Sequence, residues 1–113
     1  MTAPPEEVAG PWAELGTPLL VAEPGVRAWV EVVPPGEERP THTHRHPWVT
    51  VVVSGAAGES YGADGELIGT NTLTTGQVVW NGADKLPFTH HVRNTSDRTL
   101  VMVAVELRPP STD

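Results

Sequence analysis

Proline and glycine interrupt this chain so often that it has no room for a long regular segment. Twelve prolines and eleven glycines occur among its 113 residues. Between them lie short stretches rich in valine and threonine, and no stretch repeats apolar residues at the spacing of an amphipathic helix. Short segments of this composition, separated by turn residues, are typical of strands. The pattern therefore predicts an all-β sandwich or barrel with no sizeable helix.

The expected strands follow directly from these interruptions. An Asp64-Gly65 pair predicts a hairpin turn. Val49–Val53 and Leu100–Val105 are apolar on both faces, so we expect one face in the core and the other against the N-terminal arm or a second subunit. The predicted strands are Leu19–Glu23, Val26–Val33, Thr41–His46, Trp48–Ser54, Glu66–Leu73, Gln77–Asn81, Phe88–Asn94 and Thr99–Leu107.

The length of the chain is that of one domain, and neither repeats nor linkers divide it. Residues 1–17 contain several prolines and glycines and are expected to form an irregular arm. Residues 18–108 are expected to form a single barrel domain. Residues 109–113, which follow two prolines, are expected to be a loose tail.

Composition excludes several classes of protein. A net charge of −7 argues against binding to nucleic acid or to anionic membranes. No apolar run approaches the roughly 20 residues of a membrane span, and the acidic start does not resemble a signal peptide. We therefore expect a cytoplasmic protein that acts on a small molecule. Because the chain has no cysteine, it cannot form disulfides or thiolate metal sites.

Three of the five histidines alternate along one predicted strand. His42, His44 and His46 are two residues apart, so on a strand they point to the same face, about 6.5–7 Å apart. Two imidazoles at this spacing can converge on a metal ion, with bonds of about 2.0–2.1 Å. A third ligand has to come from another strand, and His90 is the candidate.

The other two histidines are expected to be non-ligands. His46 precedes Pro47, which disturbs the pleat, so its side chain is expected to turn away, although it remains a possible extra ligand. His91 follows His90 and should face the opposite side of the strand. The whole tract could alternatively be a solvated edge strand with incidental affinity for metal.

These residues resemble the two sequence motifs of the cupin superfamily. In the first motif, glycine is followed by five residues and His-x-His, as in Gly36 and His42-Thr43-His44. Where the family usually has a glutamate ligand, six residues before Gly55, this chain has Trp48. The second motif begins at Gly76 and ends with His90 and Asn94 at the family's spacing, but its middle is longer and lacks Pro-x-Gly.

The resemblance implies a small single-domain RmlC-like cupin, a double-stranded β-helix (jelly-roll) barrel. His42, His44 and His90 would then bind one divalent metal in a three-His site that lacks the usual glutamate. Three-His cupin sites are similar to those of Fe(II) dioxygenases, so Fe(II) is favoured, with Zn, Ni or Mn as alternatives. We expect a dioxygenase acting on a small anionic or chelating substrate. A redox-neutral isomerase, cyclase or decarboxylase, or a non-catalytic ligand-binding cupin, remains open.

Strand phase predicts the surroundings of this site. Glu31, on the second predicted strand, is the candidate acid–base group if its carboxylate faces the barrel interior; the alternative is that it faces water on a twisted strand. Cupins commonly pair, and the apolar strand faces also favour a homodimer. The side chains expected to line the pocket are large or lie in phase with the histidines: Trp29, Trp48, Thr50, Trp80, Phe88 and Met102.

Overall fold

The chain folds into two antiparallel sheets. The computed structural model describes residues 15, 17 and 19–108; the rest of the predicted arm and the tail lie outside the described residues. The elements are β1 (Leu19–Glu23), β2 (Val26–Val33), β3 (His42–His44), β4 (Trp48–Ser54), β5 (Ala56–Gly62), β6 (Leu67–Leu73), β7 (Val78–Asn81), the 3-10 turn η2 (Ala83–Lys85), β8 (Phe88–Asn94) and β9 (Leu100–Leu107).

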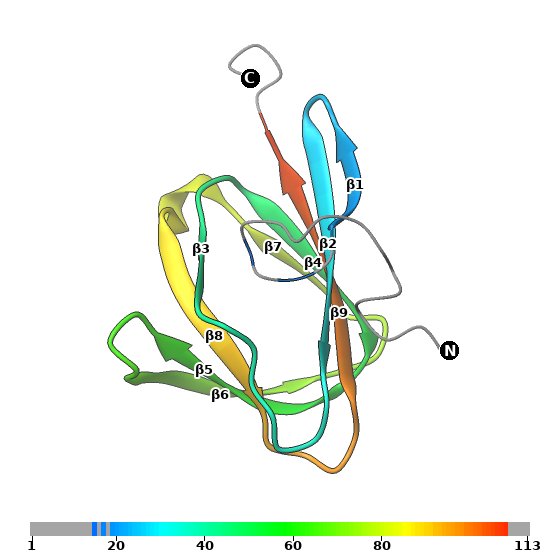
Figure 1. Ribbon diagram of the computed structural model, residues 1–113, viewed down its shortest axis with the longest axis vertical. Helices are drawn as coiled ribbons and strands as arrows, with labels where there is room; N and C mark the ends of the chain where they lie inside the picture. The colour runs from blue at the N-terminus through cyan, green and yellow to red at the C-terminus, as the bar shows by residue number, and fades with distance from the viewer. Residues whose placement is uncertain (1–14, 16, 18, 109–113) are drawn as a thin grey trace.

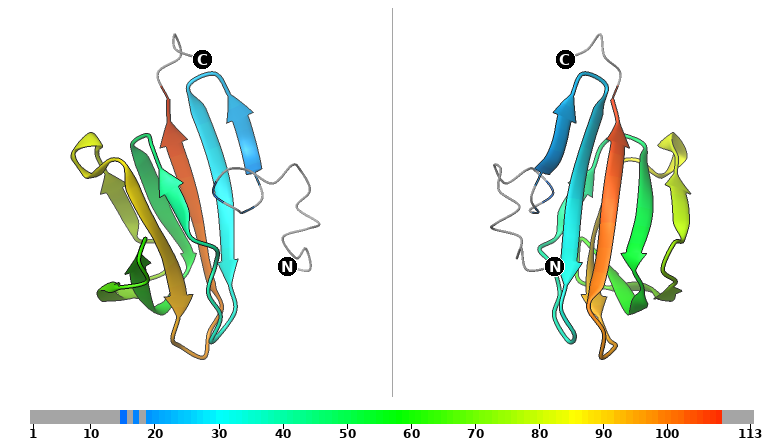
Figure 2. Two further views of the ribbon diagram at one scale, coloured as in Figure 1. Left: turned by 60° about the vertical axis from the view of Figure 1, so that its left-hand side comes forward. Right: turned by 90° about the vertical axis from the view of Figure 1, so that its right-hand side faces the viewer.

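The two sheets face each other across a shared interior. The larger has the order β1-β2-β9-β4-β7, and the smaller has the order β3-β8-β5-β6. Figure 1 and the turned views of Figure 2 show the chain alternating between the sheets from β2 to β5 and again from β6 to β9, as in a jelly roll, while β1–β2 and β5–β6 are hairpins within one sheet. The prediction of an all-β barrel is confirmed. Among the described residues, no helix is long or apolar enough to span a membrane.

Two strands differ substantially from the sequence-based expectation, while β6, β7 and β9 each begin one residue later than predicted. The strand predicted over Thr41–His46 is shortened to β3, His42–His44. Proline on either side, at positions 40 and 47, removes the backbone N–H that would extend the pairing. The sequence does not single out β5, because its Ala-Ala-Gly-Glu-Ser-Tyr-Gly stretch has little of the β-branched character that marks the other strands. The turn after it contains Gly65 at φ +82°, as the Asp64-Gly65 signal requires.

A small apolar core closes the interior at one end. Val33 on β2 and Leu100 on β9 are direct partners in the sheet and are both fully buried. Val52, Ala56, Val92 and Met102 complete the cluster. Because side chains alternate along a strand, the residues in phase with Val33 and Leu100 also point inward, toward the open end of the interior.

The turn between β8 and β9 is fastened by one fully buried asparagine. Asn94 donates from Nδ2 to the carbonyl oxygen of Val33 (2.9 Å), and its Oδ1 accepts from the backbone N–H and hydroxyl of Ser96 (2.9 and 2.8 Å). Its polar groups are thereby satisfied despite complete burial. The asparagine of the second motif therefore joins the two sheets, while the histidine of the same motif lies in the interior.

Truncation of a buried leucine should cost far more than truncation of an exposed one. Leu100→Ala removes a side chain with no exposed surface, and we expect a loss of about 2–5 kcal/mol in the free energy of unfolding. Leu67→Ala is the matched control, since Leu67 is 53% exposed, and should cost less than about 1 kcal/mol. Urea denaturation measures both; equal losses would contradict this assignment of the core.

Candidate metal centre

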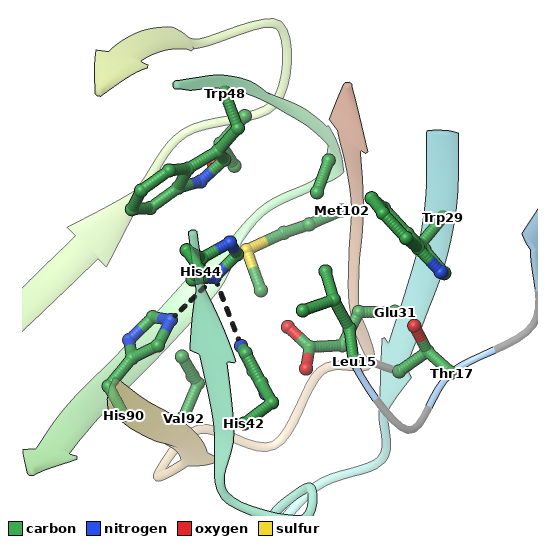
Figure 3. A pocket seen from close by; sticks show the side chains of 12 residues that line it. Leu15, Thr17, Trp29, Glu31, His42, His44, Trp48, His90, Val92 and Met102 are labelled. Carbon is green, nitrogen blue, oxygen red and sulfur yellow. Dashed lines mark hydrogen bonds between the residues drawn. The ribbon is translucent and has the colours of Figure 1, made fainter. Parts of the chain in front are cut away.

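The pairing of β3 with β8 brings together histidines that are distant in sequence. In the antiparallel register His42 lies opposite His90, and His44 lies opposite Phe88. Because β3 keeps its pleat over three residues, His42 and His44 point to the same side, into the interior. His90, one strand away and in phase, joins them (Figure 3).

Three imidazole nitrogens converge at this point. Nε2 of His44 lies 3.1 Å from Nε2 of His42 and 3.1 Å from Nε2 of His90. The candidate ligand atoms of the three residues all lie within 4.8 Å of one another. In the described part of the chain, these three residues are the group of His, Cys, Asp or Glu side chains that could hold a metal ion.

Neighbouring groups hold these rings in place. Nδ1 of His42 lies 3.1 Å from the carbonyl oxygen of Pro40. Because a carbonyl oxygen only accepts hydrogen bonds, the ring proton is on Nδ1, and Nε2 keeps a lone pair that can bind a metal. Trp48 stacks on His44, with ring centroids 3.7 Å apart and an interplanar angle of 6°. Phe88 packs on His90 with a centroid distance of 4.6 Å. The rings are therefore oriented before any ligand arrives.

All three imidazoles are held in their neutral form. Burial lowers the pKa of His44 to about 3, and the neighbouring His42 and His90 add to the effect. Burial, followed by the charges of His42 and His91, lowers the pKa of His90 to about 3. Burial also lowers the pKa of His42, against the opposing hydrogen bond to Pro40. Neutral imidazole is the form that binds metals.

The donor set fits a divalent transition metal. Two nitrogens bonded to one ion at about 2.1 Å, at angles between 90° and 110°, lie roughly 3.0–3.4 Å apart. Two of the three pairs, His44 with His42 and His44 with His90, have this spacing at 3.1 Å. Nδ1 of His44 and of His90 is buried without a hydrogen-bond partner in the described structure. Imidazole ligands suit Zn, Cu, Fe and Ni, so the set by itself does not choose among them.

An indole occupies the position where the first cupin motif has its glutamate. Trp48 is buried, and its Nε1–H donates to the hydroxyl of Thr50 at 3.1 Å. Its ring lies flat between His44 and Phe88, whose centroid is 6.0 Å away. This side chain therefore contributes an apolar wall beside the histidines.

The histidines form one wall of a small cavity of about 70 Å³. The opposite wall belongs to the larger sheet and includes Trp29, Glu31 and Met102 (Figure 3). Glu31 is half-buried, and burial raises the pKa of its carboxyl from 4.5 to about 7, against the lowering effect of the Arg39 charge. The complete lining is Leu15, Thr17, Trp29, Glu31, His42, His44, Trp48, Thr50, His90, Val92, Met102 and Ala104.

Of the six side chains expected to line the pocket, Trp29, Trp48, Thr50 and Met102 line the cavity, whereas Trp80 and Phe88 do not. Trp80 is 57% exposed and does not line the cavity, because it pairs with Val49, which lies out of phase with Trp48 and points outward. Phe88 lies one layer behind the lining, against Trp48 and His90.

The remaining histidines lie outside the converging group. His46 falls in the bend after β3 and is not part of it. His91 faces the other side of the smaller sheet, where its Nε2 lies 2.9 Å from Glu38 and its Nδ1 lies 3.0 Å from Thr41.

Sequence reasoning missed part of the lining. Leu15 and Thr17 come from the segment assigned to the irregular arm, yet both are only 3% exposed and close one side of the cavity. No local pattern marks them, since a coil residue has no periodicity to reveal its direction. Strand alternation does predict that Val92 and Ala104 line the cavity, because Val92 lies two residues from His90 and Ala104 lies two residues from Met102.

Comparison with known proteins shows which fold this chain shares. No protein-family model matches the sequence, and no curated protein matches it. Among solved structures, it is similar to a cupin domain from Bordetella pertussis Tohama I, at 24% identity over 80% of this chain and 90% of that one, with a TM-score of 0.69. The fold is that of an RmlC-like cupin.

Two further cupins illustrate the range of this fold. An RmlC-like cupin from Methanocaldococcus jannaschii matches at 20% identity over 83% of this chain and 80% of that one, with a TM-score of 0.60. A sugar phosphate isomerase of the cupin superfamily from Silicibacter pomeroyi matches at 16% identity over 76% of this chain and 52% of that one, with a TM-score of 0.52. These likenesses show the cupin fold, which here carries a candidate three-His metal site.

Acidification should destabilise the metal-free cupin through its buried imidazoles. An unfolded histidine takes up a proton near pH 6.5, whereas folded His44 and His90 have pKa values of about 3. Between these values the unfolded state binds more protons, so the free energy of unfolding falls as the pH falls from about 6.5 toward 3. His44→Gln removes one such proton and should flatten the slope by up to about 1.4 kcal/mol per pH unit.

Urea denaturation with a chelator, at intervals between pH 7 and pH 5, measures this slope. Glu31 acts in the opposite direction, because its pKa is raised to about 7 and the folded state holds its proton between pH 4.5 and 7. That contribution is common to the wild type and His44→Gln, so the difference between them isolates the histidine. An identical slope in the two proteins would contradict the assignment.

Proposed function

We propose that this cupin is a metal-dependent enzyme acting on a small molecule, with one divalent ion held by His42, His44 and His90. The observation that carries the proposal is the convergence of three neutral imidazoles in the cavity, where Nε2 of His44 lies 3.1 Å from Nε2 of His42 and from Nε2 of His90. An incidental surface site would need neither the burial nor the ring stacking that orient these imidazoles.

A dioxygenase with Fe(II) is the reaction class we favour. Three neutral ligands leave the full charge of a bound dication, which when bound would polarise substrate oxygens and attract an anionic chelating group. The chain's own contribution is an apolar cavity lined by Trp29, Trp48 and Met102, which suits the apolar or planar body of a small substrate and excludes water.

Glu31 is the proposed acid–base group of the site. It faces the cavity from the wall opposite the histidines, and burial raises its carboxyl pKa to about 7 (Figure 3). Near neutral pH, a carboxyl group with such a pKa can either take up or release a proton, because neither step requires much free energy. Thr50, whose hydroxyl accepts from Trp48 Nε1, provides a second polar group in the lining.

A redox-neutral isomerase is the second candidate. The sugar phosphate isomerase from Silicibacter pomeroyi shares the fold, and a Lewis-acid metal with a carboxyl partner is the machinery that proton transfer beside a carbonyl requires. The ligand set is compatible with Zn, Ni or Mn as well as Fe(II).

Metal analysis of untagged protein tests the proposed site. We expect about one divalent ion per chain from a mononuclear site, and loss of that ion in His42→Ala, His44→Ala or His90→Ala. His46→Ala is the matched control, because His46 lies outside the converging group, and should retain the metal. Wild-type protein that binds no metal after incubation with Fe(II), Zn, Ni or Mn would overturn the proposal.

Oxygen uptake then distinguishes the two reaction classes. A dioxygenase should consume O₂ with a chelating anionic substrate only when loaded with Fe(II), and His42→Ala should abolish the consumption. Turnover with Zn, Ni or Mn and without O₂ would instead favour the isomerase.

A further inference from the structure

One acidic side chain in the cavity has no partner of its own. Glu31 forms no hydrogen bond or ion pair with any described residue, although it lies in a mostly apolar space. The positive charge that lowers its pKa is that of Arg39, whose Nη1 donates to the carbonyl oxygen of Val32 at 3.2 Å and not to Glu31. A carboxylate in such surroundings is costly unless a positive charge lies near it.

The candidate metal site contains no negatively charged ligand, and Glu31 can supply a negative charge. His42, His44 and His90 are neutral ligands, so a bound dication would keep both of its charges inside the barrel. The position that supplies a carboxylate in the first cupin motif is Trp48, which offers none. Glu31 comes from β2 on the larger sheet, whereas the histidines come from β3 and β8 on the smaller sheet (Figure 3).

We propose that Glu31 is the counter-charge of the metal centre, an ionised carboxylate that compensates one charge of the dication from the wall opposite the imidazoles. The proposal rests on the metal site proposed above. It transfers the electrostatic role of the missing motif glutamate to a different strand, and leaves the coordination positions facing the cavity open to substrate. In its ionised form Glu31 could also accept a proton from a substrate held in the cavity.

Metal affinity in a charge-neutral variant tests this role without reference to activity. Co²⁺ titration of wild-type protein and Glu31→Gln, followed by the visible absorption of the ion, should show at least tenfold weaker binding in the variant. Glu37→Gln makes the same change in net charge at an exposed position outside the cavity, and should bind within about twofold of wild type. Glu31→Asp retains the charge and should recover part of the affinity.

Anion binding provides a second readout. Removing the counter-charge leaves the loaded site more positive, so azide should bind the Co²⁺ form of Glu31→Gln more tightly than that of the wild type. Equal Co²⁺ affinity in wild type and Glu31→Gln would overturn the counter-charge while leaving the three-His site intact. Wild-type protein that binds no Co²⁺ would overturn both.

Discussion

The pairing of β3 with β8 is the contact on which the functional interior depends. β3 has three residues and is flanked by proline, so it has little capacity to hold itself in place. Its register against β8 nevertheless sets His42 opposite His90. The next pair in the register, Thr43 and Thr89, has its hydroxyls 2.9 Å apart on the other face and stabilises the same alignment. A slip of one residue would turn both histidines of β3 away from the interior.

Trp48, at the position where the first cupin motif has a glutamate, shapes the wall of the cavity. Its ring stacks on His44 and makes the surface beside the three histidines apolar. The acidic side chain of the lining is Glu31, which lies on the larger sheet with Trp48, whereas His42, His44 and His90 lie on the smaller sheet. The geometry of the candidate site therefore depends on how the two sheets pack as well as on local sequence.

Much of the fold follows from local chemistry that a single sequence displays. β1, β2, β4 and β8 coincide with the strands expected from their Val-rich or alternating composition and from the turn residues around them. β5 could not be predicted in this way, because Ala56–Gly62 is a strand only through its neighbours β6 and β8. The strength of its pairing comes from tertiary position rather than from propensity.

The sequence by itself determined which residues can bind a metal and that two of them share a strand face, because a strand alternates with a period of two. It also determined that no thiolate takes part. Only the tertiary structure decided that His90 reaches His42, that Trp80 points outward, and that Leu15 and Thr17 close the cavity. These outcomes depend on register between distant strands and on the path of a coil segment, neither of which leaves a periodic signal in the chain.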